Sequence, residues 1–162
     1  MVNKSAAKGG AFERKIRDIF ETYYDIPFER VPSSGALDYL KGDVWAPHHQ
    51  HVWPYVIECK HYKELDFNSL LTAKSNDLYS FWEQATRQVE EQEEKSGRKK
   101  IALVVFRWNR SKNYVICELE EIPLEHIVVK AHGHAFCIAL LDDWLKSNKL
   151  VKKLIDKDKN SL

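Results

Sequence analysis

Hydrophobic and polar positions repeat along this chain with two periods, and each period predicts one kind of element. Residues 11–24 and 81–95 carry apolar side chains at helical spacing, which predicts two amphipathic helices that end near Pro27 and Gly97. Residues 142–155 are expected to form a final helix. Short runs rich in β-branched and aromatic residues predict strands at 28–31, 43–45, 55–60, 101–108, 114–119 and 134–141.

The order of these elements predicts an α/β or α+β domain, in which helices flank a central mixed β-sheet. Because no repeat, low-complexity segment or linker divides the sequence, residues 1–162 are expected to form a single domain. We expect residues 1–10 to be a flexible polar arm and residues 156–162 to be a lysine-rich tail.

The strand at residues 55–60 contains an acid and an amine that need an explanation. Side chains alternate along a strand, so Glu58 and Lys60 share one face, about 7 Å apart. Tyr55, Ile57 and Cys59 point to the other face. Charged groups are seldom buried unless they are paired or bind a metal. On an exposed face, the same two residues would be only a weak surface ion pair.

Asp43 precedes Glu58 at a distance that suits a hairpin. If the two residues lie opposite each other in an antiparallel pair, residues 48–53 form the connecting loop. Asp43, Glu58 and Lys60 would then share one face of the sheet. Three charges that converge beside a buried hydrophobic pattern favour a functional site over a solvated surface.

Three side chains on the two predicted helices are further candidates. Glu13 lies on or beside the apolar stripe of the first helix. Its alternative role is structural, since an acid suits a helix's first turn and Arg17 follows at i+4. Gln84 and Gln88 flank the inner stripe of the second helix, one turn apart. Either glutamine is a candidate to point at the carboxylates, although glutamine is also an ordinary surface residue.

The predicted hairpin loop contains His48, His49 and His51, which raises a zinc hypothesis. No Cys or acid lies at the spacing of a structural zinc site. A solvated hairpin tip is therefore the favoured interpretation, and a zinc-binding regulatory domain stays open as an alternative.

Charge and cysteine content narrow the class of protein. Lys and Arg total 25 and Asp and Glu total 24, so any nucleic-acid surface must come from segregation of the charges. The clearest basic bias is at the C-terminus. No apolar run approaches the roughly 18 residues of a membrane span. The N-terminus lacks a signal-peptide core, and the 3 cysteines sit in apolar segments, so we expect a cytoplasmic protein with reduced thiols.

The candidate residues together resemble the PD-(D/E)XK nuclease superfamily. The resemblance rests on Glu13, Gly42-Asp43, Glu58-Cys59-Lys60 and Gln84, within a match over roughly residues 9–106. It implies a restriction-endonuclease-like core. Residues 30–35, Arg-Val-Pro-Ser-Ser-Gly, are similar to the serine-containing loop of archaeal-type Holliday junction resolvases, and a viral or prophage relative is expected. The sequence departs from the superfamily's name in having Gly42 where proline would precede the aspartate.

The resemblance also implies a role for each residue. Asp43, Glu58 and the carbonyl of Cys59 would hold Mg²⁺, with Mn²⁺ as a substitute. Glu13 would help to place a second ion or its water shell. Lys60 would orient the attacking water or neutralise charge on the phosphorane. Gln84 is preferred over Gln88 to position that water or Lys60.

The serine-containing loop and the substrate complete the hypothesis. Ser33 or Ser34 would contact phosphate, with Ser34 the preferred residue. Two symmetric cuts in a four-way junction imply a twofold dimer. The sequence therefore predicts a Mg²⁺-dependent, structure-selective DNA endonuclease that resolves Holliday junctions. A restriction- or repair-type endonuclease acting on other duplex or branched DNA, and a non-catalytic DNA-binding protein on the same scaffold, remain alternatives.

Overall fold

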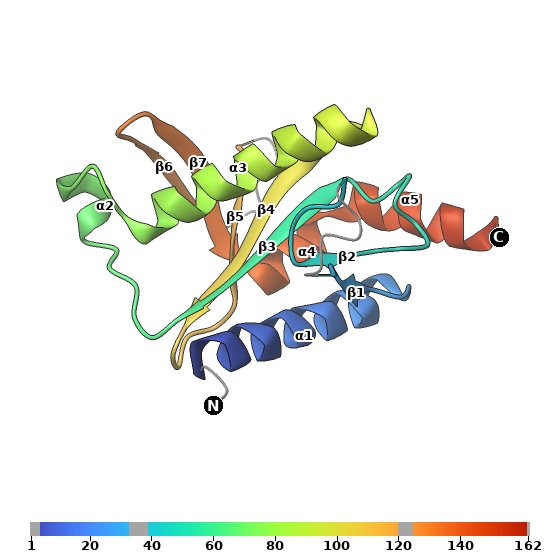
Figure 1. Cartoon of the computed structure of the whole chain (residues 1–162), viewed down its shortest axis with the longest axis horizontal. Helices are drawn as coiled ribbons and strands as arrows, with labels where there is room; N and C mark the ends of the chain where they lie inside the picture. The colour runs from blue at the N-terminus through green and yellow to red at the C-terminus, as the bar shows by residue number, and fades with distance from the viewer. Residues whose placement is uncertain (1–3, 33–38, 120–124, 162) are drawn as a thin grey trace.

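The computed structural model describes residues 4–32, 39–119 and 125–161 (Figure 1). The helices are α1 (Lys4–Tyr24), α2 (Ser69–Thr72), α3 (Asp77–Ser96), α4 (Leu141–Ser147) and α5 (Lys149–Asn160). The strands are β1 (Glu29–Arg30), β2 (Val44–Trp45), β3 (Tyr55–Tyr62), β4 (Ile101–Trp108), β5 (Tyr114–Cys117), β6 (Ile127–Ala131) and β7 (His134–Leu140). No helix within these ranges is long and apolar enough to cross a membrane.

The described strands form one mixed sheet in the order β1-β2-β3-β4-β5-β7-β6. β3 and β4 lie side by side and parallel, because the chain between them crosses the sheet through α3. The other neighbouring strands in this order pair antiparallel. This arrangement confirms the predicted fold class, a mixed sheet flanked by helices.

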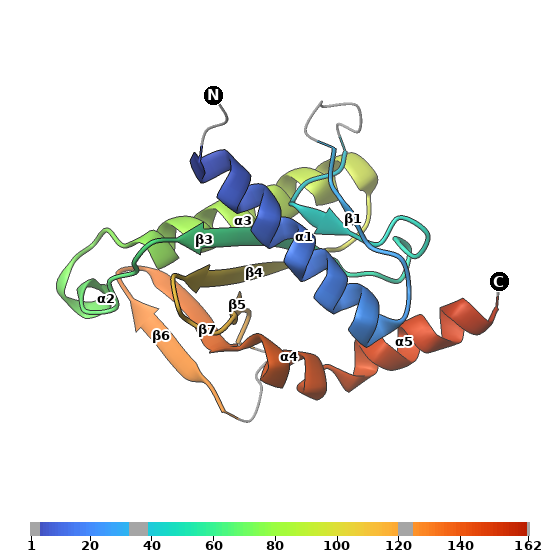
Figure 2. The same cartoon turned by 90° about the horizontal axis from the view of Figure 1, so that it is seen from below.

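Helices cover the sheet on both faces, as Figures 1 and 2 show from two directions. On one face α1 inserts Phe12, Ile16 and Phe20 into a core that also contains Ile57 of β3. α4 and α5 add their apolar side chains to the same core. On the other face, Phe81, Ala85 and Val89 of α3 pack in a second core. The apolar stripes predicted from the sequence are therefore the two buried helix faces.

Several predicted boundaries were wrong. α1 begins at Lys4, so residues 4–10 are helical and do not form a flexible arm. The predicted helix at 142–155 is two helices, which meet at Asn148, and the second continues through most of the predicted tail. β6 was not predicted, because residues 127 and 128 are exposed and lack the buried alternation of the other strands. The strand predicted at 28–31 is reduced to two residues.

Candidate active site

The candidate site lies at the beginning of β2, which runs beside the longer strand β3. Val44 pairs with Ile57, which is the register predicted from the sequence. β3 turns Ile57 toward the core under α1, whereas Val56 packs in the core under α3. Because side chains alternate, Glu58 and Lys60 lie on the α3 face, as predicted.

Gly42 is the residue at which the chain turns into the sheet, immediately before Asp43 and β2. Its φ is +89°, and a Cβ atom there would lie 2.8 Å from the carbonyl oxygen of Ile57. Glycine is therefore required for both the backbone conformation and the close approach. Proline, with φ fixed near −65°, could not adopt this conformation. The departure from the superfamily's motif thus has a structural reason.

The carboxylate of Asp43 accepts a hydrogen bond from β3 that a longer β2 would accept through its backbone. The backbone N–H of Asp43 donates to the carbonyl of Ile57 at 2.7 Å. Two residues further along β3, the N–H of Cys59 donates to Oδ2 of Asp43, also at 2.7 Å. A backbone donor that would otherwise lack a partner is satisfied by a side chain. This hydrogen bond fixes the Asp43 carboxylate against β3.

Gln84 of α3 joins Glu58 and Lys60 in one network. Its amide nitrogen donates to Oε2 of Glu58 at 3.1 Å, and its Oε1 accepts from Nζ of Lys60 at 2.7 Å. Nζ of Lys60 is also 3.5 Å from Oε2 of Glu58. Glu58 is only 3% exposed. The structure thus brings Gln84, the glutamine preferred from the sequence, to the acid and the lysine.

The two acids, Glu58 buried and Asp43 half-buried, have raised pKa values. Burial, followed by repulsion from Glu58, raises the pKa of Asp43 from 3.8 to about 7. Burial also raises the pKa of Glu58, against the attraction of Lys60 and a hydrogen bond from Gln88. A cation bound between two neighbouring carboxylates would favour their ionised forms. Carboxylate oxygens fit a hard divalent ion such as Mg²⁺.

Glu13 reaches the edge of this site and is already paired. Its Oε2 accepts from Nε of Arg30 at 2.7 Å and lies 2.6 Å from the NH2 nitrogen of Arg30. The charge of Glu13 contributes to the raised pKa of Asp43 and of Glu58, so it acts on both acids. The pairing of Arg30 with Glu13 could not be predicted from the sequence. The two residues are 17 positions apart, on a helix and on a two-residue strand, and no periodic pattern joins them.

Cys59 has the chemistry expected of a backbone ligand. Its side chain packs against the core under α1. Burial and the neighbouring Asp43 raise the pKa of its thiol well above 9.0, so the thiol stays protonated. Only the main chain of Cys59 is available to the acids. The predicted phosphate contacts, Ser33 and Ser34, lie outside the described residues.

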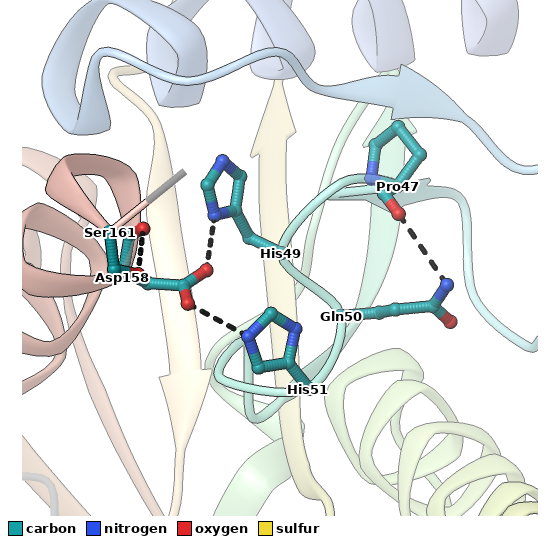
Figure 3. Close-up of polar contacts among 6 residues, drawn as sticks. All are labelled: Pro47, His49, Gln50, His51, Asp158 and Ser161. Atoms are coloured by element: carbon teal, nitrogen blue, oxygen red, sulfur yellow. Dashed lines mark hydrogen bonds and ion pairs between the residues drawn. The ribbon is translucent and has the colours of Figure 1, made fainter.

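The histidine loop is a structural element and not a solvated tip. His49 is 3% exposed, and its Nδ1 lies 2.6 Å from Oδ2 of Asp158 on α5. Nε2 of His51 lies 2.8 Å from the other oxygen of the same carboxylate, as Figure 3 shows. The ring hydrogen bonds lower the pKa of Asp158. Within the described ranges no group of three or more His, Cys, Asp or Glu side chains is placed to hold a metal ion, which applies to the histidine loop and equally to Glu13 with the two acids.

Basic side chains lie near the open end of β3. The parallel register puts Arg107 of β4 beside His61, one residue after Lys60. The turn that follows β4 carries Arg110 and Lys112, and Nε2 of His61 is 3.2 Å from Oδ1 of Asn109 in that turn. Three cations thus lie at the end of the β3–β4 pair, just beyond Lys60 along the strand.

Comparisons with known proteins add the family. The profile of a family described as "Phage putative PDDEXK endonuclease" matches residues 4–153. Protein D14 of Escherichia phage T5 is 26% identical over 156 residues, which cover 90% of this chain and 94% of that protein. Among solved structures, Hjc, a Holliday junction resolvase from Archaeoglobus fulgidus, aligns over 85% of this chain and 87% of its own, with 14% identity and a TM-score of 0.41.

Proposed function

From the premise that this chain belongs to the phage PD-(D/E)XK endonuclease family, we propose that it is a Mg²⁺-dependent, structure-selective DNA endonuclease that cuts four-way junctions. The family makes the protein a nuclease; the ion and the junction are our proposal. The observation that supports it best is that Asp43, Glu58 and Lys60 lie together on β3 and its edge. Gln84 bridges Glu58 and Lys60, and the N–H of Cys59 holds Asp43. Mn²⁺ is expected to substitute for Mg²⁺.

Asp43, Glu58 and the carbonyl of Cys59 would hold the ion. The chemistry supplied by the ion when it is bound is polarisation of the scissile phosphate and a lower pKa for a bound water. The carboxylate of Asp43 is held in place by the N–H of Cys59, and that of Glu58 by the amide of Gln84. Such contacts fix the geometry of ligands before the substrate arrives.

Lys60 would act on the phosphate and on the attacking water. Its side chain is only 20% exposed, and its ammonium donates to Oε1 of Gln84 at 2.7 Å. In that position it neutralises the negative charge that develops on phosphorus-bound oxygens, or orients the water that attacks. Gln84 is a positioning residue for both Lys60 and Glu58. Glu13, now paired with Arg30, would help to place a second ion or its water shell.

The basic residues around the site would bind phosphates of the DNA backbone. Arg30 at the edge and Arg107, Arg110 and Lys112 near the β4–β5 turn supply these charges. The affinity for DNA should then fall steeply as the salt concentration rises. The preference for four-way junctions rests on the similarity of residues 30–35 to the loop of junction resolvases. Two symmetric cuts would require a twofold dimer acting in the cytoplasm of a phage host.

The proposal is tested by cleavage of a synthetic four-way junction beside a duplex of the same arm sequence, with Mg²⁺ or Mn²⁺. We expect the wild-type protein to cut the junction preferentially and in paired positions. Asp43→Asn, Glu58→Gln and Lys60→Ala should abolish cleavage while junction binding, measured in EDTA, is unchanged. Equal cutting of the duplex would refute junction selectivity. Wild-type turnover by the Glu58→Gln variant would refute the role of the acids.

A further inference from the structure

A cavity lies near the candidate active site and is used by none of the chemistry above. Its volume is about 290 Å³. It is lined by aromatic side chains, by cations and by short polar groups: Tyr39, Leu40, Lys41, Trp45, Ala46, Gln50, Trp53, Tyr55, Gln92, Ser96, Arg98 and Lys100. Among these residues three carry a positive charge and none carries a carboxylate. One of the three cations, Lys41, is paired, because its Nζ lies 3.6 Å from Oε2 of Glu91. The positive charge of the cavity is therefore carried mainly by Arg98 and Lys100.

The cavity is connected to the acids along two paths. Lys41 precedes Asp43 by two residues, and two residues of extended chain span at most about 7 Å. The backbone N–H of Lys41 donates to Oε1 of Gln92 at 2.9 Å. Gln92 lies eight residues after Gln84 on α3, a rise of about 12 Å. A polar stripe of α3 therefore runs from the active-site network to the cavity.

The walls of the cavity are rich in hydrogen-bond donors. The indole N–H groups of Trp45 and Trp53 are buried and find no acceptor in the parts of the chain that the structure describes. Nζ of Lys100 donates to the carbonyls of Gln50 and Trp53, at 3.2 and 2.8 Å, and an ammonium has a third donor. Lys100 is 8% exposed. The third donor of Lys100 is therefore the one that a ligand's acceptor would use here.

We propose that this cavity holds one nucleotide of the DNA substrate, displaced from its stack beside the cut. A displaced base needs an aromatic wall, which Tyr39 and Trp45 supply, and partners for its polar edge, which the ammonium of Lys100 and the hydroxyl of Ser96 supply. Its phosphate needs a cation, which Arg98 supplies. The volume lies at the lower end of the roughly 300–1,000 Å³ of small-ligand sites, which suits one base. This inference rests on the proposed function, since it names a feature of the substrate.

The test measures binding alone, so that it does not depend on cleavage. The Glu58→Gln protein is titrated in EDTA with a fluorescent duplex, and with the same duplex carrying one unpaired adenosine. We expect the duplex with the unpaired base to bind about 10-fold more tightly, because one stacked base contributes roughly 1–3 kcal/mol. Free dAMP is added as a competitor to separate a nucleotide of the strand from a mononucleotide in solution.

Two variants and a matched control locate the effect. In the same background, Arg98→Ala and Tyr39→Ala should reduce the preference to about twofold or less. Both side chains reach the surface, so removing them should preserve the fold, which a circular dichroism melt verifies. Lys99→Ala removes an exposed charge next to Arg98 that does not line the cavity. It should keep the full preference.

The outcomes separate this inference from the proposed function. An equal affinity for the two duplexes, or a preference that survives Arg98→Ala and Tyr39→Ala, would overturn the inference. Displacement of both duplexes by free dAMP at equal concentrations would overturn it as well, since the cavity would then serve a free nucleotide. The wild-type protein failing to cut any DNA with Mg²⁺ or Mn²⁺ would instead refute the proposed function, and the binding difference would still be measurable.

Discussion

Replacing Asp43 by asparagine should abolish cleavage and at the same time stabilise the protein at neutral and alkaline pH. The pKa of Asp43 rises from 3.8, the ordinary value of an aspartate, to about 7 in the folded chain, mainly because the carboxyl is desolvated and Glu58 is near. The folded state therefore keeps a proton that the unfolded state has already released between these two pH values. Wherever the folded state binds more protons, stability falls as the pH rises.

The size of this effect follows from the pKa difference. One pKa unit corresponds to about 1.4 kcal/mol, so a rise of about three units amounts to about 4 kcal/mol of lost stability above pH 7. Asparagine keeps an oxygen that can accept from the N–H of Cys59 and carries no charge at any pH. The variant should thus match the wild type near pH 4 and exceed it by up to about 4 kcal/mol at pH 8.

Urea unfolding in EDTA, from pH 4 to pH 8.5, measures the difference directly. Asp18→Asn, which neutralises an exposed acid of α1, is the matched control and should change the unfolding free energy by no more than about 0.5 kcal/mol. Added Mg²⁺ should stabilise the wild type and not the Asp43→Asn variant, because only the wild type offers both carboxylates. A variant that is no more stable than the wild type at pH 8 would refute the proposed electrostatics.

Three further changes test other parts of the site. Gly42→Ala should destabilise the fold by about 2–4 kcal/mol in urea, because φ is +89° and the new Cβ meets the Ile57 carbonyl; Gly97→Ala, at φ +68° in open space, should cost only about 1–2 kcal/mol, and equal losses would contradict the steric argument. Gln84→Ala should lower the rate of cleavage about 10- to 100-fold without weakening DNA binding, as single-turnover kinetics would show; a loss confined to binding would disprove the positioning role. Asp158→Asn should lower the midpoint of thermal unfolding above pH 4, where the lowered pKa of Asp158 makes its ionised form stabilising; this difference should shrink as the pH falls through that pKa, and a difference independent of pH would argue against the charged contact.

The part of the site on β2 and β3 could be predicted because its geometry is local. Alternation along a strand places Glu58 and Lys60 on one face, and the chain length between Asp43 and Glu58 fixes the register of a hairpin. The helical period likewise placed Gln84 beside a buried stripe. In each case, the relevant distance depends on a few neighbouring residues only.

Contacts between distant elements could not be predicted in this way. The pairing of Glu13 with Arg30 depends on how α1 crosses the edge of the sheet. The contact of His49 with Asp158 joins residues 109 positions apart. The left-handed conformation of Gly42 depends on the closeness of β3, which no spacing in the sequence reveals. Such features depend on how distant elements pack against one another, which the spacing of residues in the sequence does not specify.

Because β2 begins only after Gly42, it is short, and its length also determines which molecules can approach the acids. β2 has two residues and β3 has eight, so most of the β3 rim on that side extends past its partner. If β2 began earlier and included Gly42, a main-chain carbonyl would accept the hydrogen bond from the Cys59 N–H. The added backbone would then lie against the carboxylates and cover them. Lengthening β2 by a few residues would therefore block access to the carboxylates without altering any catalytic side chain. The length of this one strand thus controls whether DNA can reach the acids.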